Sequence, residues 1–302
     1  MTIRFDDRVA IVTGAGSGLG RSHALALAAR GARVVVNDFA GAASGGGKRP
    51  ADLVVEEIRA AGGTAIANGS SVSVPEEAAA MVDQAVSEFG RIDILVNNAG
   101  FLRDRSFAKL SPQDFDAVVA VHLAGAAYCT MAAWAPMREQ NFGRIVFTTS
   151  NSGLFGNFGQ SNYAAAKAGL IGLMNALKQE GGKYGIAVNT LAPMAATPMT
   201  ETVMDEATKE AFDPALVSAA VAYLCSDDFT ESGHIVSTAG GYLSAVRVMS
   251  SEGVLLGKAA TPEAIADNWP KINDFSKARG FGSAGEEMRH ILDRLAAARA
   301  AA

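Results

Sequence analysis

The chain has 302 residues, of which 49% are hydrophobic and 19% charged. This composition is typical of a globular protein with a sizeable core and unlike that of a disordered chain. A net charge of -5 gives no electrostatic basis for binding nucleic acid or an anionic membrane. No uninterrupted apolar run reaches the length of a transmembrane helix, so neither kind of partner is expected.

The N-terminal sequence and the cysteines suggest a cellular location. The start, MTIRFDDRVAIVTG, lacks a charged segment followed by an apolar one, so no signal peptide is expected. Cys129 and Cys225 lie far apart in apolar, helix-like segments, which favours buried free thiols over a disulfide. We therefore predict a cytoplasmic protein.

Short apolar runs alternate with helix-like segments along most of the chain. Strands are expected at 9–14, 32–38, 64–68, 91–100, 144–150, 186–193 and 233–241. Helices are expected at 22–31, 51–63, 75–90, from about Ser111, from about Asn162, and at 214–226. This alternation predicts an α/β fold with a doubly wound parallel sheet of seven strands, a Rossmann fold.

The chain beyond residue 250 departs from this pattern. Thr261 followed by Pro262 is typical of a helix start, and a closing helix is expected at 286–300. We therefore divide the chain into a Rossmann-type domain, 1–250, and a C-terminal helical extension, 251–302. Its apolar residues must pack on the same subunit or on a partner.

A glycine-rich turn follows the first strand and opens the first helix. The turn holds Gly14, Ser17, Gly18, Leu19 and Gly20. Glycines there let the backbone approach a pyrophosphate, and the helix N-terminus supplies amide donors. An ordinary strand-to-helix turn is the alternative.

Asp38 ends the second strand, where a carboxylate can accept both hydroxyls of an adenine ribose. The same charge repels a 2′-phosphate, which favours NAD over NADP. The alternative for Asp38 is a simple cap after the strand, and the nearby Arg21, Lys48 and Arg49 complicate the choice of cofactor.

The glycine spacing and later motifs together resemble the short-chain dehydrogenase/reductase family. The other matches are Asn97-Asn98-Ala99-Gly100 after the fourth strand, Ser150 after the fifth, Tyr163 with Lys167, and Asn189 to Pro193 in the sixth. The resemblance implies NAD bound along the carboxyl ends of these strands. It assigns cofactor contacts to Asn98, Ala99, Gly100, Tyr163, Lys167, Pro193 and Thr197, with Ser71 and Val72 at the adenine end.

The resemblance also implies the chemistry. Tyr163 would act as acid and base toward a hydroxyl, and Ser150, preferred over Thr149 and Ser152, would hold the same oxygen. Lys167 would favour the phenolate and hold the nicotinamide ribose. His122 stands where many members carry Asn, and it either serves a proton relay or is a hydrogen-bonded core histidine.

Within the family, the chain is similar to the (3R)-hydroxyacyl-CoA dehydrogenase units of peroxisomal multifunctional enzymes. The motifs are NNAGFLRDRSFAKL, GLFGNFGQSNYAAAKAGL and TPEAIADNWPKINDF. The similarity implies a free-standing NAD-dependent oxidoreductase that acts on an acyl-CoA substrate. Residues that could line the substrate site, or be ordinary packing residues, are Ser150, Leu154, Phe155, Phe158, Met194 and Met199.

Two other functions remain open, and the assembly and metal content can also be predicted. A hydroxysteroid or other secondary-alcohol dehydrogenase, or a 3-oxoacyl-thioester reductase, is the alternative enzyme, and a non-catalytic scaffold is the third possibility. The resemblance implies a homodimer or homotetramer. No metal is expected.

Overall fold

The computed structural model describes residues 2–41, 47–197 and 205–300. The chain divides into two compact units, Met1–Ala245 and Val246–Ala302. The boundary expected from the sequence lay between residues 250 and 251, slightly beyond this one.

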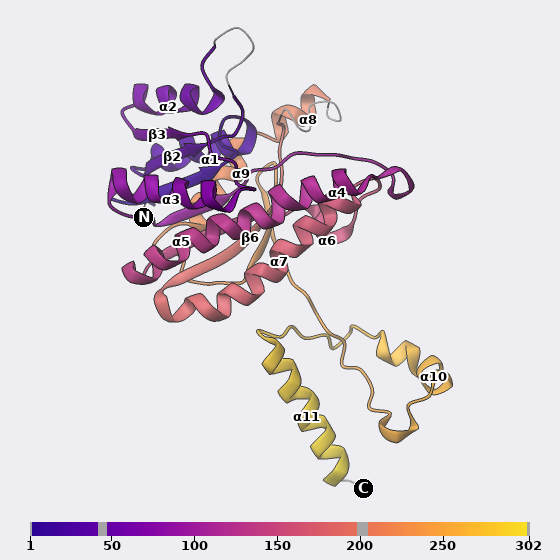
Figure 1. The fold of residues 1–302 in the computed structure, drawn as a ribbon. Coiled ribbons are helices and arrows are strands. Elements are labelled where there is room, and N and C mark those ends of the chain that lie inside the picture. Colours follow the sequence, from indigo (N-terminus) through magenta and orange to yellow (C-terminus); the bar gives the residue numbers. More distant parts are fainter. Residues whose placement is uncertain (1, 42–46, 198–204, 301–302) are drawn as a thin grey trace. The chain divides into compact units, whose positions relative to one another are not determined.

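An eight-stranded sheet forms the centre of the larger unit, in the order β3-β2-β1-β4-β5-β6-β7-β8 (Figure 1). The strands are β1 (Val9–Thr13), β2 (Arg33–Asn37), β3 (Thr64–Asn68), β4 (Ile94–Asn97), β5 (Gly143–Thr148), β6 (Ile186–Met194), β7 (Ile235–Ala239) and β8 (Tyr242–Val246). The first seven strands in this order, from β3 through β1 to β7, run parallel to their neighbours. The doubly wound α/β class predicted from the sequence is therefore confirmed.

All seven predicted strands form, and the chain then turns back after β7 and adds an eighth strand, β8. Gly240 and Gly241 join the two strands, with φ angles of 53° and 82°. Two successive positive φ angles form the tight turn of a two-residue hairpin, and glycine adopts them without strain. From the sequence alone, these glycines are expected at the end of the last strand, 233–241.

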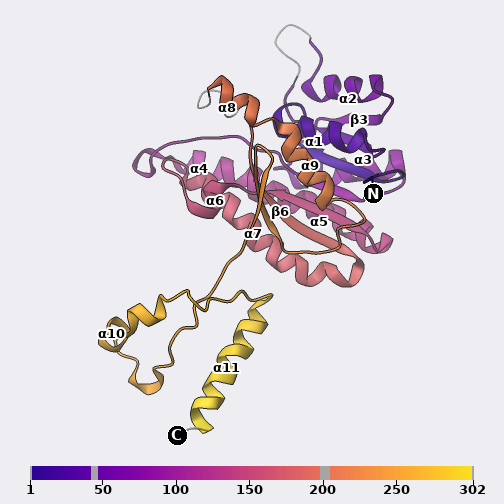
Figure 2. The same cartoon turned by 180° about the vertical axis from the view of Figure 1, so that it is seen from behind.

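Helices cover both faces of the sheet (Figures 1 and 2). Helices α1 (Gly18–Ala28), α2 (Pro50–Ala60) and α9 (Pro214–Leu224) contact one another or the strands on one side. Helices α3 (Pro75–Phe89), α5 (Ala126–Gln140) and α7 (Ser161–Gly181) form the other layer. Apolar side chains of β1, β2 and β4 pack under α1 and α9 in the main core.

The helix predicted from about Ser111 is one continuous helical stretch of three parts. It begins as α4 (Pro112–Val119), passes through a π-helical turn, η2 (Ala120–Gly125), and continues as α5. By length and composition alone, residues 112–140 could cross a membrane. Here α5 instead packs against α3, β4 and β5, as the core helices of large α/β domains do.

The remaining helical segments of the larger unit are short. They are η1 (Phe107–Lys109), α6 (Asn151–Phe155), η3 (Gly182–Tyr184) and α8 (Glu206–Ala211).

The smaller unit contains η5 (Gly257–Ala259), α10 (Pro262–Ile272) and α11 (Ala284–Ala300). The Thr261 hydroxyl accepts a hydrogen bond from the Ala264 amide, so α10 begins with the cap expected from the sequence. Ser250 and Arg279 exchange backbone hydrogen bonds and hold the unit together. Neither α10 nor α11 has a buried residue.

A buried carboxylate fixes the starts of β1 and β4. Asp93 is fully buried, and it accepts hydrogen bonds from Arg8 (3.0 Å), Arg91 (2.6 and 2.8 Å) and the Val9 amide (2.9 Å). Four donors on one carboxylate offset the cost of burying it. This contact sets the register of the two central strands.

We predict that Asp93→Ala lowers the free energy of unfolding by about 2–4 kcal/mol, because it leaves buried donors without an acceptor. Denaturant unfolding measures the change. Asp227→Ala is the control, since its carboxylate also pairs with Arg8 but is 59% exposed. Equal losses in the two variants would contradict the assignment.

Candidate active site

The glycine-rich turn brings the backbone after β1 into close contact with itself. A Cβ on Gly20 would lie 2.1 Å from the Gly14 carbonyl oxygen, and Gly14 itself has a φ of 63°. Helix α1 then begins at Gly18 with no acidic residue in its first turn. An open cradle of amides at a helix N-terminus suits a pyrophosphate, so the turn fits a dinucleotide.

The segment after β4 locks onto this turn. The Thr13 hydroxyl accepts hydrogen bonds from the Asn98 and Ala99 amides, each at 3.0 Å. The Asn98 side chain donates to the carbonyls of Thr13 and Gly14 at 3.0 and 3.2 Å. These contacts lie where the strand order reverses between β1 and β4, the usual ligand position in such sheets.

Asp38 lies beside the turn, directly after β2. Its carboxylate accepts hydrogen bonds from the Gly16 amide (2.8 Å) and the Ala40 amide (2.9 Å). A Cβ on Gly16 would lie 2.6 Å from the same carboxylate, so only glycine allows this approach. A half-buried acid is thus presented next to the cradle, as the sequence predicted for a ribose contact.

Ser150, Tyr163 and Lys167 come together from two consecutive elements. Ser150 lies two residues after the end of β5 and caps α6, where its hydroxyl accepts from the Ser152 amide at 3.1 Å. The Ser150 hydroxyl is also hydrogen-bonded to the Tyr163 phenol. One turn further along α7, the Lys167 ammonium lies 5.5 Å from the centre of the Tyr163 ring and donates to the Thr148 carbonyl.

Burial disfavours the charged forms of both Tyr163 and Lys167. It lowers the pKa of Lys167 from 10.5 to about 7. The pKa of Tyr163 is raised, mainly by burial, although the Ser150 hydrogen bond opposes the change. The polypeptide by itself therefore does not produce the phenolate that the sequence analysis expected Lys167 to favour.

His122 lies in the π-helical turn and contacts Tyr163 edge-on, with ring centres 5.1 Å apart. Its Nε2 atom is 3.0 Å from the Phe101 amide nitrogen and 2.8 Å from the Phe101 carbonyl oxygen. Burial and the charge of Lys167 lower its pKa to about 3, so the ring is neutral near pH 7. Gly100 leaves room for the ring, since a Cβ there would lie 2.0 Å from it.

The other predicted cofactor residues lie around the same edge of the sheet. Pro193 is near the end of β6, Thr197 follows that strand, and Val72 packs against η2 at Gly125. The Ser71 amide donates to Glu77 at 2.6 Å, so in this chain it is already engaged. The cofactor contacts of Ser71, Val72, Pro193 and Thr197 stay predictions.

The predicted substrate residues are mostly exposed. Phe155 and Phe158 are 75% and 90% exposed, Met194 is partly exposed, and Leu154 is half-buried. The two phenylalanines are therefore not core residues. Met199 lies outside the described residues.

The positioning roles of two neighbouring residues were not predicted from the sequence. Thr13 holds the turn after β4, and the Asn162 side chain both accepts from the Tyr163 amide and donates to the Arg103 carbonyl. Thr13 directly precedes the glycine motif, which was a usable signal. Asn162 offered none, because its partners come from a distant loop.

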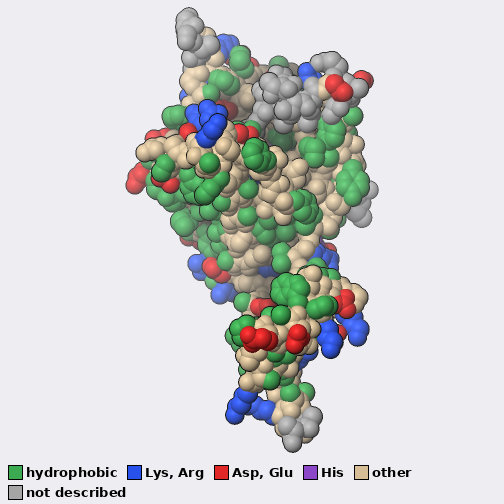
Figure 3. All heavy atoms as spheres, turned by 90° about the vertical axis from the view of Figure 1, so that its right-hand side faces the viewer, with side chains coloured by type: hydrophobic (Ala, Val, Ile, Leu, Met, Phe, Trp, Pro, Cys, Tyr) green, Lys and Arg blue, Asp and Glu red, His purple; other side chains and the backbone are tan. Residues whose placement is uncertain are grey.

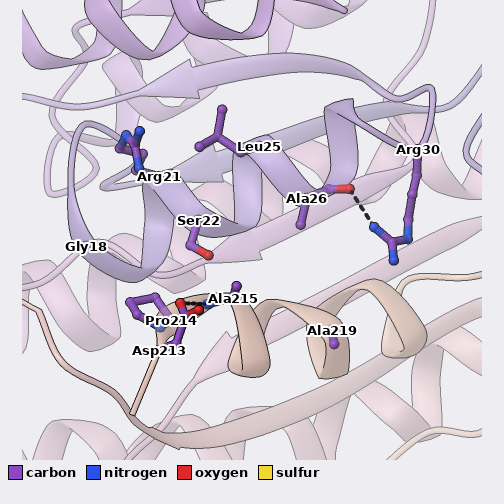
Figure 4. A pocket seen from close by; sticks show the side chains of 10 residues that line it. All are labelled: Gly18, Arg21, Ser22, Leu25, Ala26, Arg30, Asp213, Pro214, Ala215 and Ala219. Atoms are coloured by element: carbon purple, nitrogen blue, oxygen red, sulfur yellow. Dashed lines mark hydrogen bonds between the residues drawn. The ribbon is translucent and has the colours of Figure 1, made fainter. Parts of the chain in front are cut away.

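A surface cavity of about 650 Å³ reaches the glycine-rich turn only at Gly18 and otherwise lies away from this site. It lies between α1 and α9, and Figure 4 shows Ser22 and Ala26 on the side of α1 that faces Pro214 and Ala215. None of the four predicted catalytic residues lines it, so we assign the site by chemistry and not by cavity size. Among the described residues, no cluster of His, Cys, Asp or Glu is placed to hold a metal.

A family model described as short chain dehydrogenase matches residues 8–210. The chain therefore belongs to the short-chain dehydrogenase family, whose members are oxidoreductases.

Among its relatives is peroxisomal multifunctional enzyme A of Dictyostelium discoideum, 48% identical over 97% of this chain and 66% of the relative. The solved full-length peroxisomal multifunctional enzyme type 2 of Drosophila melanogaster superposes with a TM-score of 0.83 at 40% identity, covering 97% of this chain and 50% of that one. A 7α-hydroxysteroid dehydrogenase solved with NADH and a 7-oxo bile acid has a TM-score of 0.72 at 30% identity, covering 79% and 95%. The chain thus spans only about half to two thirds of the two multifunctional relatives.

The comparison corrects one expectation. The predicted cytoplasmic location is contradicted, because the multifunctional relatives are named as peroxisomal proteins. The N-terminal sequence and the free cysteines were the basis of that prediction. Cys129 and Cys225 are indeed buried and free, but a free thiol does not distinguish one reducing compartment from another.

The lowered pKa of Lys167 predicts how stability depends on pH. Between about pH 7 and 10.5 the unfolded chain binds the Lys167 proton and the folded chain does not, so folding becomes more favourable as pH rises. Lys167→Met removes this contribution. We expect the melting temperature of the wild type, relative to this variant, to rise by about 2 °C or more from pH 7 to 9. Lys183→Met, at an exposed position, is the control; parallel curves for wild type and Lys167→Met would contradict the burial argument.

Proposed function

We propose that this protein is an NAD-dependent dehydrogenase that oxidises (3R)-3-hydroxyacyl-CoA to 3-oxoacyl-CoA. The observation that carries the proposal is the grouping of Ser150, Tyr163 and Lys167 beside a dinucleotide cradle. Similarity to multifunctional enzymes along 97% of the chain supports the acyl-CoA substrate and a role in fatty-acid metabolism. The same relatives favour a peroxisomal setting.

The contacts of the basic residues near Asp38 support NAD over NADP. Arg21 pairs with Glu57, Lys48 with Glu56, and Arg49 with Asp52. Each cation that could neutralise a 2′-phosphate is therefore engaged by an acid, while Asp38 stays beside the cradle. The cradle, its amides and Asp38 would hold the pyrophosphate and adenine ribose.

The chain's own residues account for proton transfer and positioning. Ser150 holds the substrate oxygen, and Tyr163 takes its proton as the carbon–hydrogen bond breaks. Bound oxidised NAD supplies the hydride acceptor and a positive charge. That charge favours the Tyr163 phenolate, which burial alone disfavours. Lys167, fixed by the Thr148 carbonyl, would contact the ribose, and neutral His122 would keep the Tyr163 ring in place.

A hydroxysteroid or other secondary alcohol is the second candidate substrate. The observation in its favour is the structural similarity to a 7α-hydroxysteroid dehydrogenase. The same three residues would perform the step. The exposed Phe155 and Phe158 would suit either a flat steroid or an acyl chain.

We predict that Tyr163→Phe lowers kcat about 10²- to 10⁴-fold, because the variant has no group to accept the proton. NADH absorbance would be followed with 3-hydroxybutyryl-CoA, a long-chain homologue and a 17β-hydroxysteroid. NAD binding, measured by calorimetry, should be unchanged. Tyr184→Phe, at a phenol distant in sequence and held by Arg138, should behave as wild type. Undiminished turnover by Tyr163→Phe would overturn the mechanism.

We also infer that the chain is a homodimer or homotetramer in which the smaller unit packs on its own or a partner subunit. Apolar side chains of that unit support this, since Ile265, Trp269, Phe275 and Leu292 are 43–57% exposed. Helices without a buried face gain their stability from packing elsewhere.

Sedimentation of the full chain should give the mass of two or four copies. Trp269→Glu should weaken association or raise KM while leaving NAD affinity unchanged, because a charge opposes burial of that side chain. Lys271→Glu, on the same helix, is the control for charge alone. A wild-type protein that sediments as a monomer and still turns over its substrate would contradict oligomerisation.

A further inference from the structure

The loop between β4 and α4 carries cations beside the catalytic residues. Residues 103–109, RDRSFAK, contain three cations and one acid in a chain of net charge -5. Arg103 and Arg105 line a surface cavity of about 380 Å³ together with Leu102, Asp104 and Asp114. Figures 1 and 2 show this loop at the end of the sheet that carries α4 and α6.

Hydrogen bonds tie the loop to the catalytic elements at several points. Phe101 contacts His122, and the Arg103 carbonyl accepts from Asn162, the residue before Tyr163, at 3.1 Å. The Arg105 amide donates to the Gly159 carbonyl at 2.9 Å. The backbone that carries these cations is therefore held beside the catalytic elements, while the Arg103 and Arg105 side chains are exposed.

The Asp104 carboxylate is turned toward the segment after α6. It accepts from Gln160 at 2.8 Å, and its charge reaches Tyr163, where it contributes to the raised pKa of the phenol. This part of the loop is therefore close enough to Tyr163 for its charge to act on the phenol.

The two arginines differ in their partners. Arg103 lies 3.7 Å from the Asp114 carboxylate and 5.1 Å from the centre of the Phe101 ring. Arg105 donates only to the Asp104 backbone carbonyl, at 3.1 Å, and no carboxylate among the described residues pairs with it. Arg105 is therefore the cation of this loop most available to an anion.

Exposed aromatic side chains accompany the cations. Phe107 is 78% exposed two residues after Arg105, and Phe158 lies next to Gly159, which binds the Arg105 amide. Figure 3 shows hydrophobic side chains with a basic cluster at their margin on the larger unit. Aromatic rings next to arginines form a surface that binds both the ring and the phosphates of a nucleotide.

We infer that the 103–109 loop binds the phosphorylated adenosine end of the coenzyme A thioester, with Arg105 as the principal phosphate contact. This inference rests on the proposed acyl-CoA activity and assigns a residue to substrate recognition. Coenzyme A needs such a contact, because its phosphates lie a whole pantetheine arm away from the carbon that reacts. The loop starts beside His122 and Asn162 and continues to the exposed Arg105, so its outer part lies on the solvent side, where that end of the substrate would be.

The test compares two substrates with the same reacting group. 3-Hydroxybutyryl-CoA carries the phosphates, and 3-hydroxybutyryl-pantetheine does not. For Arg105→Gln we expect KM for the CoA thioester to rise about tenfold with kcat unchanged. KM for the pantetheine thioester should stay at the wild-type value. Adenosine 3′,5′-bisphosphate should inhibit the wild type competitively and the variant more weakly.

Glutamine keeps a donor for the Asp104 carbonyl and the exposed site tolerates it, so folding, checked by circular dichroism, should be unaffected. Arg138→Gln, an exposed arginine on α5 that contacts Tyr184, is the matched control and should leave both KM values unchanged.

The outcomes separate this inference from the proposed function. Wild-type turnover of the CoA thioester with no KM change in Arg105→Gln would overturn the inference and leave the function standing. An equal rise in KM for both substrates would also overturn it, since the loop would then act on the reacting end. No wild-type turnover of either thioester, with turnover of a steroid, would overturn the proposed function and the inference with it.

Discussion

The contact between the turns after β1 and β4 is the constraint on which the site depends. A Cβ on Gly14 would lie 2.8 Å from the Ala99 Cα atom, so the two backbones touch. The Thr13 hydroxyl holds the second turn through two amides. The chain then passes through Gly100 and Phe101 to the face of His122, and His122 packs on Tyr163. One close approach of backbones therefore sets both the dinucleotide cradle and the position of the phenol.

The electrostatics of the site follow from its burial. Tyr163 and Lys167 are both disfavoured in their charged forms, and His122 is neutral near pH 7. Tyr163 and Lys167 therefore do not form a permanent ion pair in the protein alone. The protonation state of the site responds instead to whatever charge is bound beside it, which couples proton transfer to the presence of an oxidised cofactor.

The sequence predicted the parallel sheet, the cradle, Asp38 and the catalytic group because each has a local signal. Apolar runs separated by amphipathic segments mark parallel strands, and glycine spacing marks a tight turn. Strand β8 was missed because Gly240 and Gly241 read equally well as the end of a strand or a turn between two. The π-helical turn that holds His122 was missed because its residues, AVHLAG, have no spacing that distinguishes it from an α-helix.

Local patterns in the sequence determined which elements form, because each element depends on residues close together in the chain. The family and the reaction type followed from the resemblance of several motifs spread between Gly14 and Pro193. Tertiary structure alone decided the rest. It placed the Arg103 carbonyl against Asn162, the Gly159 carbonyl against the Arg105 amide and the His122 ring against Gly100. It also decided the charge states of Tyr163 and Lys167. A pKa depends on how deeply a group is buried and on what lies around it, and burial is a property of the whole packed fold.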